Sequence, residues 1–175
     1  NLILSNSVFD SNYIAYNLRP PVLPDFNFEN CGGAVSAFGP QTTIRNCTFH
    51  RNFVAANGTY THASTGGGLC IAQNKLVEIY NSTFSNNSAG IGGGIGQYGH
   101  GRYLIDTSAN YAQTITMDSN IFVDNFCTLK GCGISLSPVA PMESSQRTVF
   151  KLSNSIILRN ILNPNTCKLD DSTYY

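Results

Sequence analysis

Two tetrapeptide motifs alternate along this chain from one end to the other, and they restrict its possible folds more than any other feature. The first motif reads F-x-x-N and the second is rich in glycine. Short motifs that recur about every 20–50 residues indicate a repeat architecture, in which each unit packs only against its neighbours. The F-x-x-N copies pair Phe9 with Asn12, Phe49 with Asn52, Phe84 with Asn87 and Phe122 with Asn125, and a degenerate copy runs from Ile157 to Asn160. The glycine-rich copies cover residues 32–35, 66–69, 92–95 and 131–134.

The residues around each F-x-x-N copy also align. Each unit predicts an apolar strand, an Asn turn, a second short apolar strand, another Asn turn and a glycine-rich third strand. Asn suits such turns because it tolerates the left-handed backbone conformation. Five residues before the Phe stand Leu4, Ile44, Ile79, Met117 and Leu152, and three residues before it stand Asn6, Asn46, Asn81, Ser119 and Asn154. Five residues after it stand Ile14, Val54, Ala89, Cys127 and Leu162.

This pattern predicts an all-β fold, a right-handed single-stranded parallel β-helix of about five coils. Equivalent positions of neighbouring coils would stack about 4.8 Å apart, so that like side chains form ladders of Phe, Asn and aliphatic residues. Insertions at residues 13–31, 57–65, 98–112 and 138–148 would leave the coils as loops. We expect residues 1–175 to form a single domain. Because the first residues already read as a strand, we expect a segment of a larger or processed protein.

The composition argues against several classes of partner. Ten basic residues balance ten acidic ones, which gives no general attraction to nucleic acid or to an anionic membrane. No apolar run approaches the length that spans a bilayer. Neither a C-x-x-C pair nor a cluster of His residues indicates a zinc site, so we expect no metal site and no cofactor.

Six cysteines and four N-x-[ST] sequons indicate an oxidising, secretory route and an extracellular or cell-surface location. Cys127 and Cys132 are close enough in sequence to form a local disulfide. Cys31 and Cys70 lie near the same glycine-rich strand in successive coils, so they can pair as well. Cys47 takes an inward position that other units give to Ser, as expected for a small core residue.

The four sequons differ in their expected access to a glycan. Asn57 lies in an inserted polar loop and is the best candidate, and Asn86, just before a turn, comes second. Asn46 and Asn81 fall on the Asn-turn ladder, where burial of the side chain would withhold them from glycosylation.

The alternating tetrads resemble the polymorphic membrane protein repeats (F-x-x-N and G-G-A-[ILV]) of chlamydial autotransporter adhesins. Residues 44–49, Ile-Arg-Asn-Cys-Thr-Phe, are also similar to the coil pattern of the pectate-lyase-like superfold. For the adhesin family the resemblance implies a surface-exposed passenger that adheres or assembles. The chain departs from the family tetrad at Gly94, Cys132 and Gly133.

Many parallel β-helices cleave polysaccharides, so candidate catalytic residues need a separate assessment. The Gly-His-Gly around His100 resembles a polygalacturonase motif but lies in an insertion without the paired aspartates that such chemistry needs. Asp118 and Asp124 align with mixed polar residues of other coils, and neither ladder stacks two acids, which favours a solvated face over a calcium site. The chain is therefore expected to have no catalytic residues.

The leading hypothesis is a non-enzymatic extracellular or cell-surface β-solenoid glycoprotein with a structural or adhesive role, which includes a subunit of a filamentous assembly. Its expected partners are other copies, other surface proteins and glycans. The alternative is a polysaccharide-acting lyase or hydrolase, or a degenerate relative that binds glycans.

Overall fold

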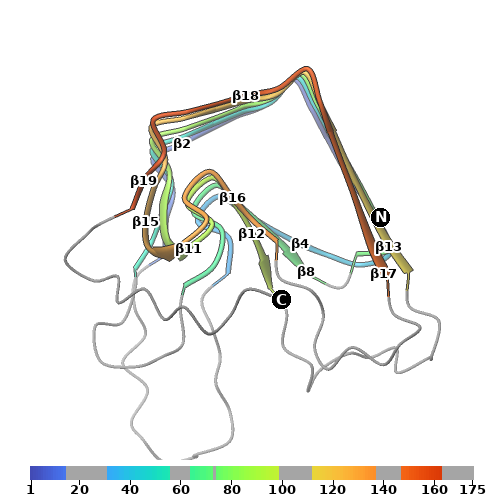
Figure 1. Ribbon diagram of the computed structural model, residues 1–175, viewed down its shortest axis with the longest axis horizontal. Coiled ribbons are helices and arrows are strands. Elements are labelled where there is room, and N and C mark those ends of the chain that lie inside the picture. The colour runs from blue at the N-terminus through green and yellow to red at the C-terminus, as the bar shows by residue number, and fades with distance from the viewer. Residues whose placement is uncertain (15–30, 56–63, 73, 99–111, 137–146, 163–175) are drawn as a thin grey trace, which may run out of the picture.

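The computed structural model describes residues 1–14, 31–55, 64–72, 74–98, 112–136 and 147–162. Within these ranges every regular element is a β-strand, and all strand pairing is parallel. The chain winds through successive coils whose strands stack along one axis, and Figure 1 looks down that axis. The expected parallel β-helix is confirmed.

Two five-stranded sheets form the first half of each coil. Sheet A contains β1 (Leu2–Ser5), β5 (Gln41–Arg45), β9 (Leu76–Tyr80), β13 (Ala112–Asp118) and β17 (Arg147–Ser153). Sheet B contains β2 (Val8–Asp10), β6 (Thr48–His50), β10 (Thr83–Ser85), β14 (Ile121–Val123) and β18 (Ile156–Leu158). We call the five turns of the chain through these sheets coils 1 to 5.

Two further sheets complete the coil, which corrects the expectation of three strands per unit. Sheet C contains β3 (Tyr13–Ile14), β7 (Phe53–Val54), β11 (Ser88–Ile91), β15 (Phe126–Lys130) and β19 (Ile161–Leu162). Sheet D contains β4 (Val35–Phe38), β8 (Leu69–Ala72), β12 (Ile95–Tyr98) and β16 (Ile134–Ser135). The glycine-rich tetrad lies between these sheets, so its glycines form a corner and only its last residue begins a strand.

The corner requires glycine at two successive positions. Gly66 has a φ of 69°, a left-handed conformation that costs glycine little. At Gly67 a side chain would collide with the coil above, since a Cβ there would lie 2.6 Å from both the backbone nitrogen and the oxygen of Ser88. Glycine therefore recurs in this corner because the backbone of one coil passes directly against that of the next.

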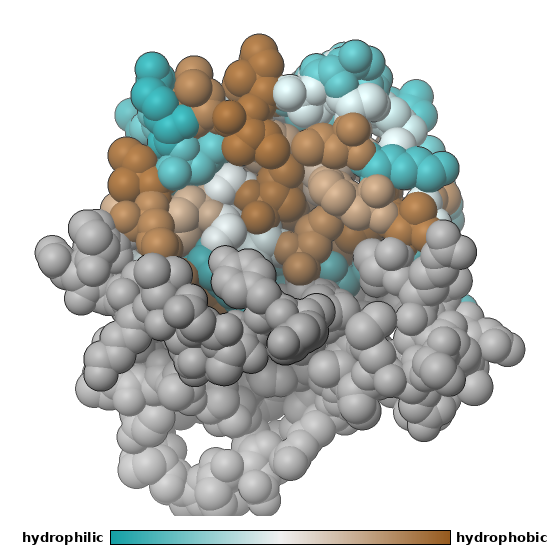
Figure 2. Space-filling model, viewed as in Figure 1, coloured by the Kyte–Doolittle hydropathy of each residue, from teal (hydrophilic) through white to brown (hydrophobic). Residues whose placement is uncertain are grey.

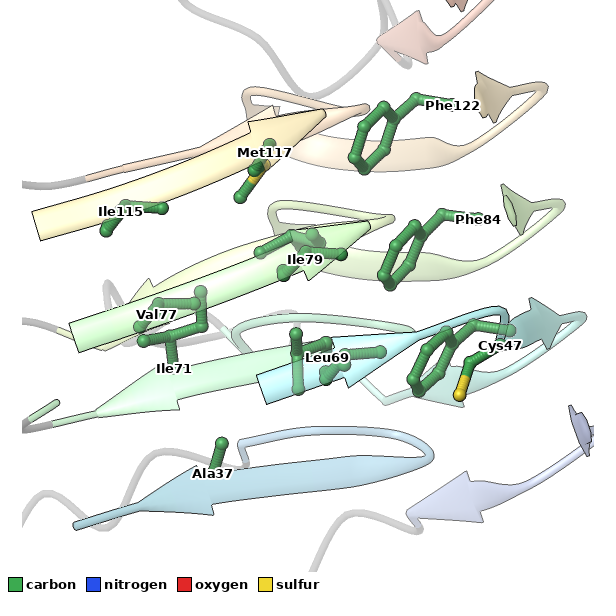
Figure 3. Packing of buried hydrophobic residues seen from close by; sticks show 13 residues of the cluster. Ala37, Cys47, Leu69, Ile71, Val77, Ile79, Phe84, Ile115, Met117 and Phe122 are labelled. Atoms are coloured by element: carbon green, nitrogen blue, oxygen red, sulfur yellow. The ribbon is translucent and has the colours of Figure 1, made fainter. Parts of the chain in front are cut away.

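The predicted ladders are present in register. Phe49 pairs with Phe9 on one side and with Phe84 on the other, and Phe84 pairs with Phe122. Neighbouring rings stack nearly parallel with centroids 4.6–5.0 Å apart. Figure 3 shows this column of rings beside the buried aliphatic side chains of sheets A and D. The core is thus a set of continuous columns along the axis.

Two further corners, between sheets A and B and between sheets B and C, are made by residues with a left-handed backbone. Between sheets A and B these are the residues of the first Asn row, with φ of 48–58°. Between sheets B and C the left-handed residue is the one before the ladder Asn. The prediction that the second row of Asn residues is itself left-handed was therefore wrong by one position. The corner residues are Asn6, Asn46, Asn81, Ser119 and Asn154 in the first set, and Ser11, Arg51, Asn86, Asp124 and Arg159 in the second.

The Phe column predicts that a substitution costs more stability in a middle coil than in coil 5. Phe84 is fully buried between two rings, so Phe84→Ala is expected to lower the free energy of unfolding by about 3–5 kcal/mol. Ile157 holds the same position in coil 5 but is half exposed, so Ile157→Ala is expected to cost only about 1 kcal/mol. Equilibrium denaturant unfolding measures both values, and equal losses would contradict the column as the main source of stability.

Candidate functional site

The most highly constrained polar feature of the molecule is a buried Asn ladder at the corner between sheets B and C. The Oδ1 of Asn87 accepts hydrogen bonds from the backbone N–H of Asn52 at 3.0 Å and from its Nδ2 at 2.9 Å. The Nδ2 of Asn87 donates to the carbonyl of Phe49 at 2.9 Å and to Oδ1 of Asn125 at 3.0 Å. Each amide thus binds the coil before and the coil after it. The same pattern joins Asn12 to Asn52 and Asn125 to Asn160.

A second buried ladder runs along the corner between sheets A and B; the sequence predicted its inward position for Cys47 but not its hydrogen bonds. The backbone N–H of Cys47 donates to Oγ of Ser82 at 3.1 Å, and the N–H of Ser82 donates to Oδ1 of Asn120 at 2.9 Å. The N–H of Asn120 in turn donates to Oγ of Ser155 at 3.1 Å. Cys47 is a free cysteine in this row, and its burial confirms the predicted inward position. In the sequence, this ladder is marked by the Ser that recurs directly after the Asn of the first row.

The two aspartates considered for catalysis lie on either side of β14: Asp118 ends β13, and Asp124 is a corner residue between sheets B and C. Asp124 holds Arg159 through two hydrogen bonds of 2.8 Å, from Nε to Oδ1 and from Nη2 to Oδ2. These bonds lower the pKa of the Asp124 carboxyl below its ordinary value. Asp10, the last residue of β2, forms a similar pair with Arg51 of coil 2, with the same effect on the pKa of Asp10.

Asp118 is held by a different set of partners. Its Oδ1 accepts hydrogen bonds from the Ser153 hydroxyl at 2.6 Å and from Nδ2 of Asn154 at 2.8 Å. The hydrogen bond from Ser153, followed by that from Asn154, lowers the pKa of this carboxyl. A carboxylate with a depressed pKa stays ionised at neutral pH and is a poor proton donor or acceptor there. Each of these acids therefore acts as a contact between neighbouring coils.

A shallow cleft lies on the outer face beside the corner between sheets A and B. Arg45, Asn46, Tyr80 and Asn81 line it. The Arg45 guanidinium lies 5.1 Å from the centre of the Tyr80 ring, and the Tyr80 hydroxyl donates to Oε1 of Glu78 at 3.2 Å. Burial, followed by the charge of Glu78, raises the pKa of Tyr80. The cleft combines an aromatic ring and a cation on a surface accessible to solvent, and the Glu78 carboxylate lies beside it as the partner of the ring hydroxyl.

The sequon asparagines on this corner are exposed, so the expectation that burial withholds Asn46 and Asn81 is wrong. The left-handed backbone turns each Asn side chain outward, and the following residue takes the inward position instead. Asn86 is also an exposed corner residue with a φ of 55°. The remaining candidate, Asn57, lies outside the described residues, as does His100.

Two disulfides join the pairs expected from the sequence. Cys31 and Cys70 link coils 1 and 2 with a Cα–Cα distance of 5.4 Å, and Cys127 and Cys132 close a short loop in coil 4. Among the described residues, no group of three His, Cys, Asp or Glu side chains is placed to hold a metal ion. The same part of the chain has no helix long and apolar enough to cross a membrane.

Comparison of the chain with protein-family models, with curated proteins and with solved structures returned no match.

The Asn ladder predicts a pH-dependent phenotype for Asn87→Asp. A carboxylate oxygen would replace the Nδ2 donor and would lie against two acceptors, the Phe49 carbonyl and Oδ1 of Asn125. We therefore expect the free energy of unfolding to fall by about 3 kcal/mol at neutral pH. Burial would raise the pKa of this carboxyl above its unfolded value of about 3.9. The protonated acid is thus favoured in the folded state, and the loss relative to wild type should shrink as pH falls through the folded-state pKa.

Unfolding of both proteins at several pH values measures this difference. Asn86→Asp is the matched control. Asn86 directly precedes Asn87 but is exposed to solvent, so its substitution should cost little stability at any pH. A pH-independent loss for Asn87→Asp would contradict the proposed donor role of its amide.

The Asp124–Arg159 pair predicts a selective change in titration. In Arg159→Gln the pKa of Asp124 should rise toward its ordinary value, because the two charge-assisted hydrogen bonds are lost. The pKa of Asp10, which depends on Arg51, should stay low. Side-chain carboxyl NMR titration measures both, and an unchanged Asp124 would show that Arg159 does not set its pKa.

Proposed function

We propose that this chain is a structural or adhesive β-solenoid of an extracellular or cell-surface glycoprotein. The proposal depends on one observation: three outward-facing aspartates bind side chains of the next coil. Asp10 and Asp124 each bind an arginine of the following coil, and Asp118 binds the side chains of Ser153 and Asn154. Chemistry on a polysaccharide would need such carboxylates to be directed at a substrate, whereas here they hold adjacent coils together.

The disulfides and sequons support a secretory origin. The Cys31–Cys70 link closes a loop of 39 residues, and such bonds persist mainly in oxidising compartments. Three of the four sequons place Asn on a solvent-exposed corner, with the hydroxyl residue two positions later on the following strand. We therefore assign the corners as glycan attachment sites and the flat sheet faces as contact surfaces for other surface proteins or glycans.

A role in assembly follows from the shape of the molecule. Each coil buries its faces only against its neighbours, and Ile157 of coil 5, with no described coil beyond it, is half exposed. A solenoid of this kind serves as a rigid spacer or as a unit of a longer filament on a cell surface. Its affinity for partners would reside in the outward rows, which vary from coil to coil while the inward ladders stay constant.

Secretion from eukaryotic cells tests the glycoprotein assignment. The secreted chain is expected to lose mass on enzymatic deglycosylation, and Thr83→Ala should remove the glycan at Asn81 while leaving this Asn in its left-handed corner. Thr83→Ser keeps the sequon and is the control. Intact-mass spectrometry measures the outcome, and a mass unaffected by deglycosylation in all forms would contradict the proposal.

Incubation with pectin and related polysaccharides tests the non-enzymatic assignment. We expect no release of oligosaccharides by the wild-type chain. Product release that is abolished in Asp124→Ala or His100→Ala would overturn the structural function in favour of an enzyme.

A further inference from the structure

The row of left-handed Asn residues at the corner between sheets A and B is interrupted between coils 2 and 3. Nδ2 of Asn46 donates to Oδ1 of Asn6 at 3.1 Å and so joins coil 2 to coil 1. Asn81 holds the equivalent place in coil 3, but within the described part of the chain its side chain makes no hydrogen bond. The shallow cleft beside this corner, which Arg45 and Tyr80 also line, lies at the step where the bond is missing.

This step lies inside the described stack. Coil 1 covers it on one side and coil 4 on the other, through the pairing of β1 with β5 and of β9 with β13. Asn46 and Asn81 are both exposed at the outer surface of the corner. In Figure 2, hydrophilic side chains gather at this corner, at the upper right of the view. The cleft therefore faces solvent from the side of the solenoid, with a coil stacked above and below it.

The Tyr80 ring that lines the cleft is held in place by its neighbours. The Arg45 guanidinium lies 5.1 Å from the centre of the ring. The Tyr80 hydroxyl donates to Oε1 of Glu78 at 3.2 Å, and Oε2 of Glu78 accepts from the Thr43 hydroxyl at 3.2 Å. These contacts restrict the ring before any ligand binds, which lowers the entropy cost of binding.

An aromatic ring beside a guanidinium suits a sugar. The apolar C–H face of a pyranose packs on an aromatic side chain, and sugar hydroxyls and an N-acetyl carbonyl accept hydrogen bonds from a guanidinium. Within the described residues no acceptor binds the Arg45 guanidinium, so its donors are available to a ligand. The cleft has a volume of about 430 Å³, at the small end of the range for ligand sites, which suits one sugar unit rather than a polymer.

Two of the four residues that line the cleft are the asparagines of sequons, Asn46 and Asn81. An N-glycan on either residue begins with an N-acetylglucosamine at the rim of the cleft. A free sugar would have to offset its whole loss of translational freedom in so shallow a site. A tethered sugar has an effective concentration on the order of millimolar or above, so weak contacts are enough to seat it. The cleft therefore fits a sugar that the chain itself carries.

Asn81 is the better placed of the two sequon asparagines. The glycan is attached through Nδ2, and this atom of Asn81 has no partner within the described residues. Nδ2 of Asn46 is instead directed to Asn6 of coil 1, away from coil 3. Thr83, which completes the sequon of Asn81, lies on β10 at an outward position next to the buried Phe84. The Asn81 sequon is thus on the outer surface, with its attachment atom beside the cleft.

We propose that the first N-acetylglucosamine of a glycan on Asn81 occupies this cleft, against the Tyr80 ring and the Arg45 guanidinium. The inference rests on the proposed glycoprotein function and names the sugar, its attachment site and the surface that binds it. The docked sugar contacts coil 2 through Arg45 and coil 3 through Tyr80. It therefore bridges the two coils at the step where the Asn row makes no bond of its own.

NMR of the attached sugar tests the docking directly. The chain is secreted from eukaryotic cells supplied with ¹³C-labelled N-acetylglucosamine and trimmed with an endoglycosidase that leaves one N-acetylglucosamine on each occupied Asn. We expect the proton signals of one such sugar to be shifted upfield by the ring current of Tyr80. The shift should vanish in Tyr80→Ala and persist in Tyr80→Phe, which keeps the ring without its hydroxyl.

Removal of single sequons assigns the shifted sugar. Thr83→Ala abolishes the sequon of Asn81 and should remove the shifted signals, whereas Thr48→Ala abolishes that of Asn46 and should leave them. Loss of the shifted signals in Thr48→Ala alone would place the glycan of Asn46 in the cleft and overturn the proposal. Signals at the positions of a free glycan in every variant would overturn it as well.

Thermal unfolding gives a second test that does not depend on labelling. Tyr80→Ala is measured in two backgrounds, Thr83→Ser, which keeps the glycan on Asn81, and Thr83→Ala, which lacks it. We expect Tyr80→Ala to lower Tm by about 2–4 °C more when the glycan is present, because only then does the ring contact a sugar. The loss of the contacts with Glu78 and Arg45 is common to both backgrounds and cancels. Equal losses in the two backgrounds would contradict the docked sugar.

The outcomes also separate this inference from the function beneath it. A secreted chain that carries glycans at other sequons but none at Asn81, or whose Asn81 sugar is unshifted, would refute the docked sugar alone. A secreted chain without any glycan would refute the glycoprotein function, and the inference with it. Polysaccharide cleavage by a chain that still shows the shifted sugar would refute the structural function and leave the docked sugar in place.

Discussion

The fold depends on hydrogen bonds that run along the solenoid axis and fix each coil in register with the next. The backbone supplies most of them, but parallel strands of two or three residues, such as those of sheets B and C, provide few bonds each. The buried Asn row adds two side-chain bonds to the next Asn and one to a carbonyl of the preceding coil, as Asn87 does. Because these amides have no alternative partner once buried, a shift of one residue in any coil would leave several polar groups unsatisfied.

Register, once fixed, places like residues on like residues, and this explains how the molecule separates structure from surface. Inward rows accept little variation because the column has a constant cross-section, as the stacked rings of Phe49, Phe84 and Phe122 illustrate. Outward rows are free to change, and residues 45, 80 and 118 of one row are Arg, Tyr and Asp. The cation over an aromatic ring and the ion pairs between coils arise in these outward rows. New surface chemistry can therefore appear in one coil without disturbing the others.

Much of this architecture could be predicted from the sequence because ladders repeat residue types at equivalent positions. The Phe column, the Asn row, the order of strands and both cysteine pairs follow from alignment of five units. The number of sheets did not, because a stretch such as Ser88–Ile91 bends into a glycine corner without a change in composition that would mark the boundary. The direction of a corner side chain was also misjudged at Asn46 and Asn81, because a left-handed residue directs its side chain outward even within a compact turn. The inward row of Cys47 and the Ser residues was predicted, but its hydrogen bonds were not, because Cys47, Ser82 and Asn120 are different residue types that donate and accept at the same position.

The Cys31–Cys70 link has a mechanical consequence. A pull along the axis would load the bonds between coils in series, and the weakest step would open first. Coils 1 and 2 are covalently joined and cannot separate under such tension, whereas the Cys127–Cys132 bond closes within coil 4 and joins it to no neighbour. The step between coils 1 and 2 would therefore hold at forces that open the steps between coils 2 and 5, which depend on hydrogen bonds and packing alone. Under tension, extension would come from coils that are not cross-linked to a neighbour, while the disulfide-linked pair keeps its stacking.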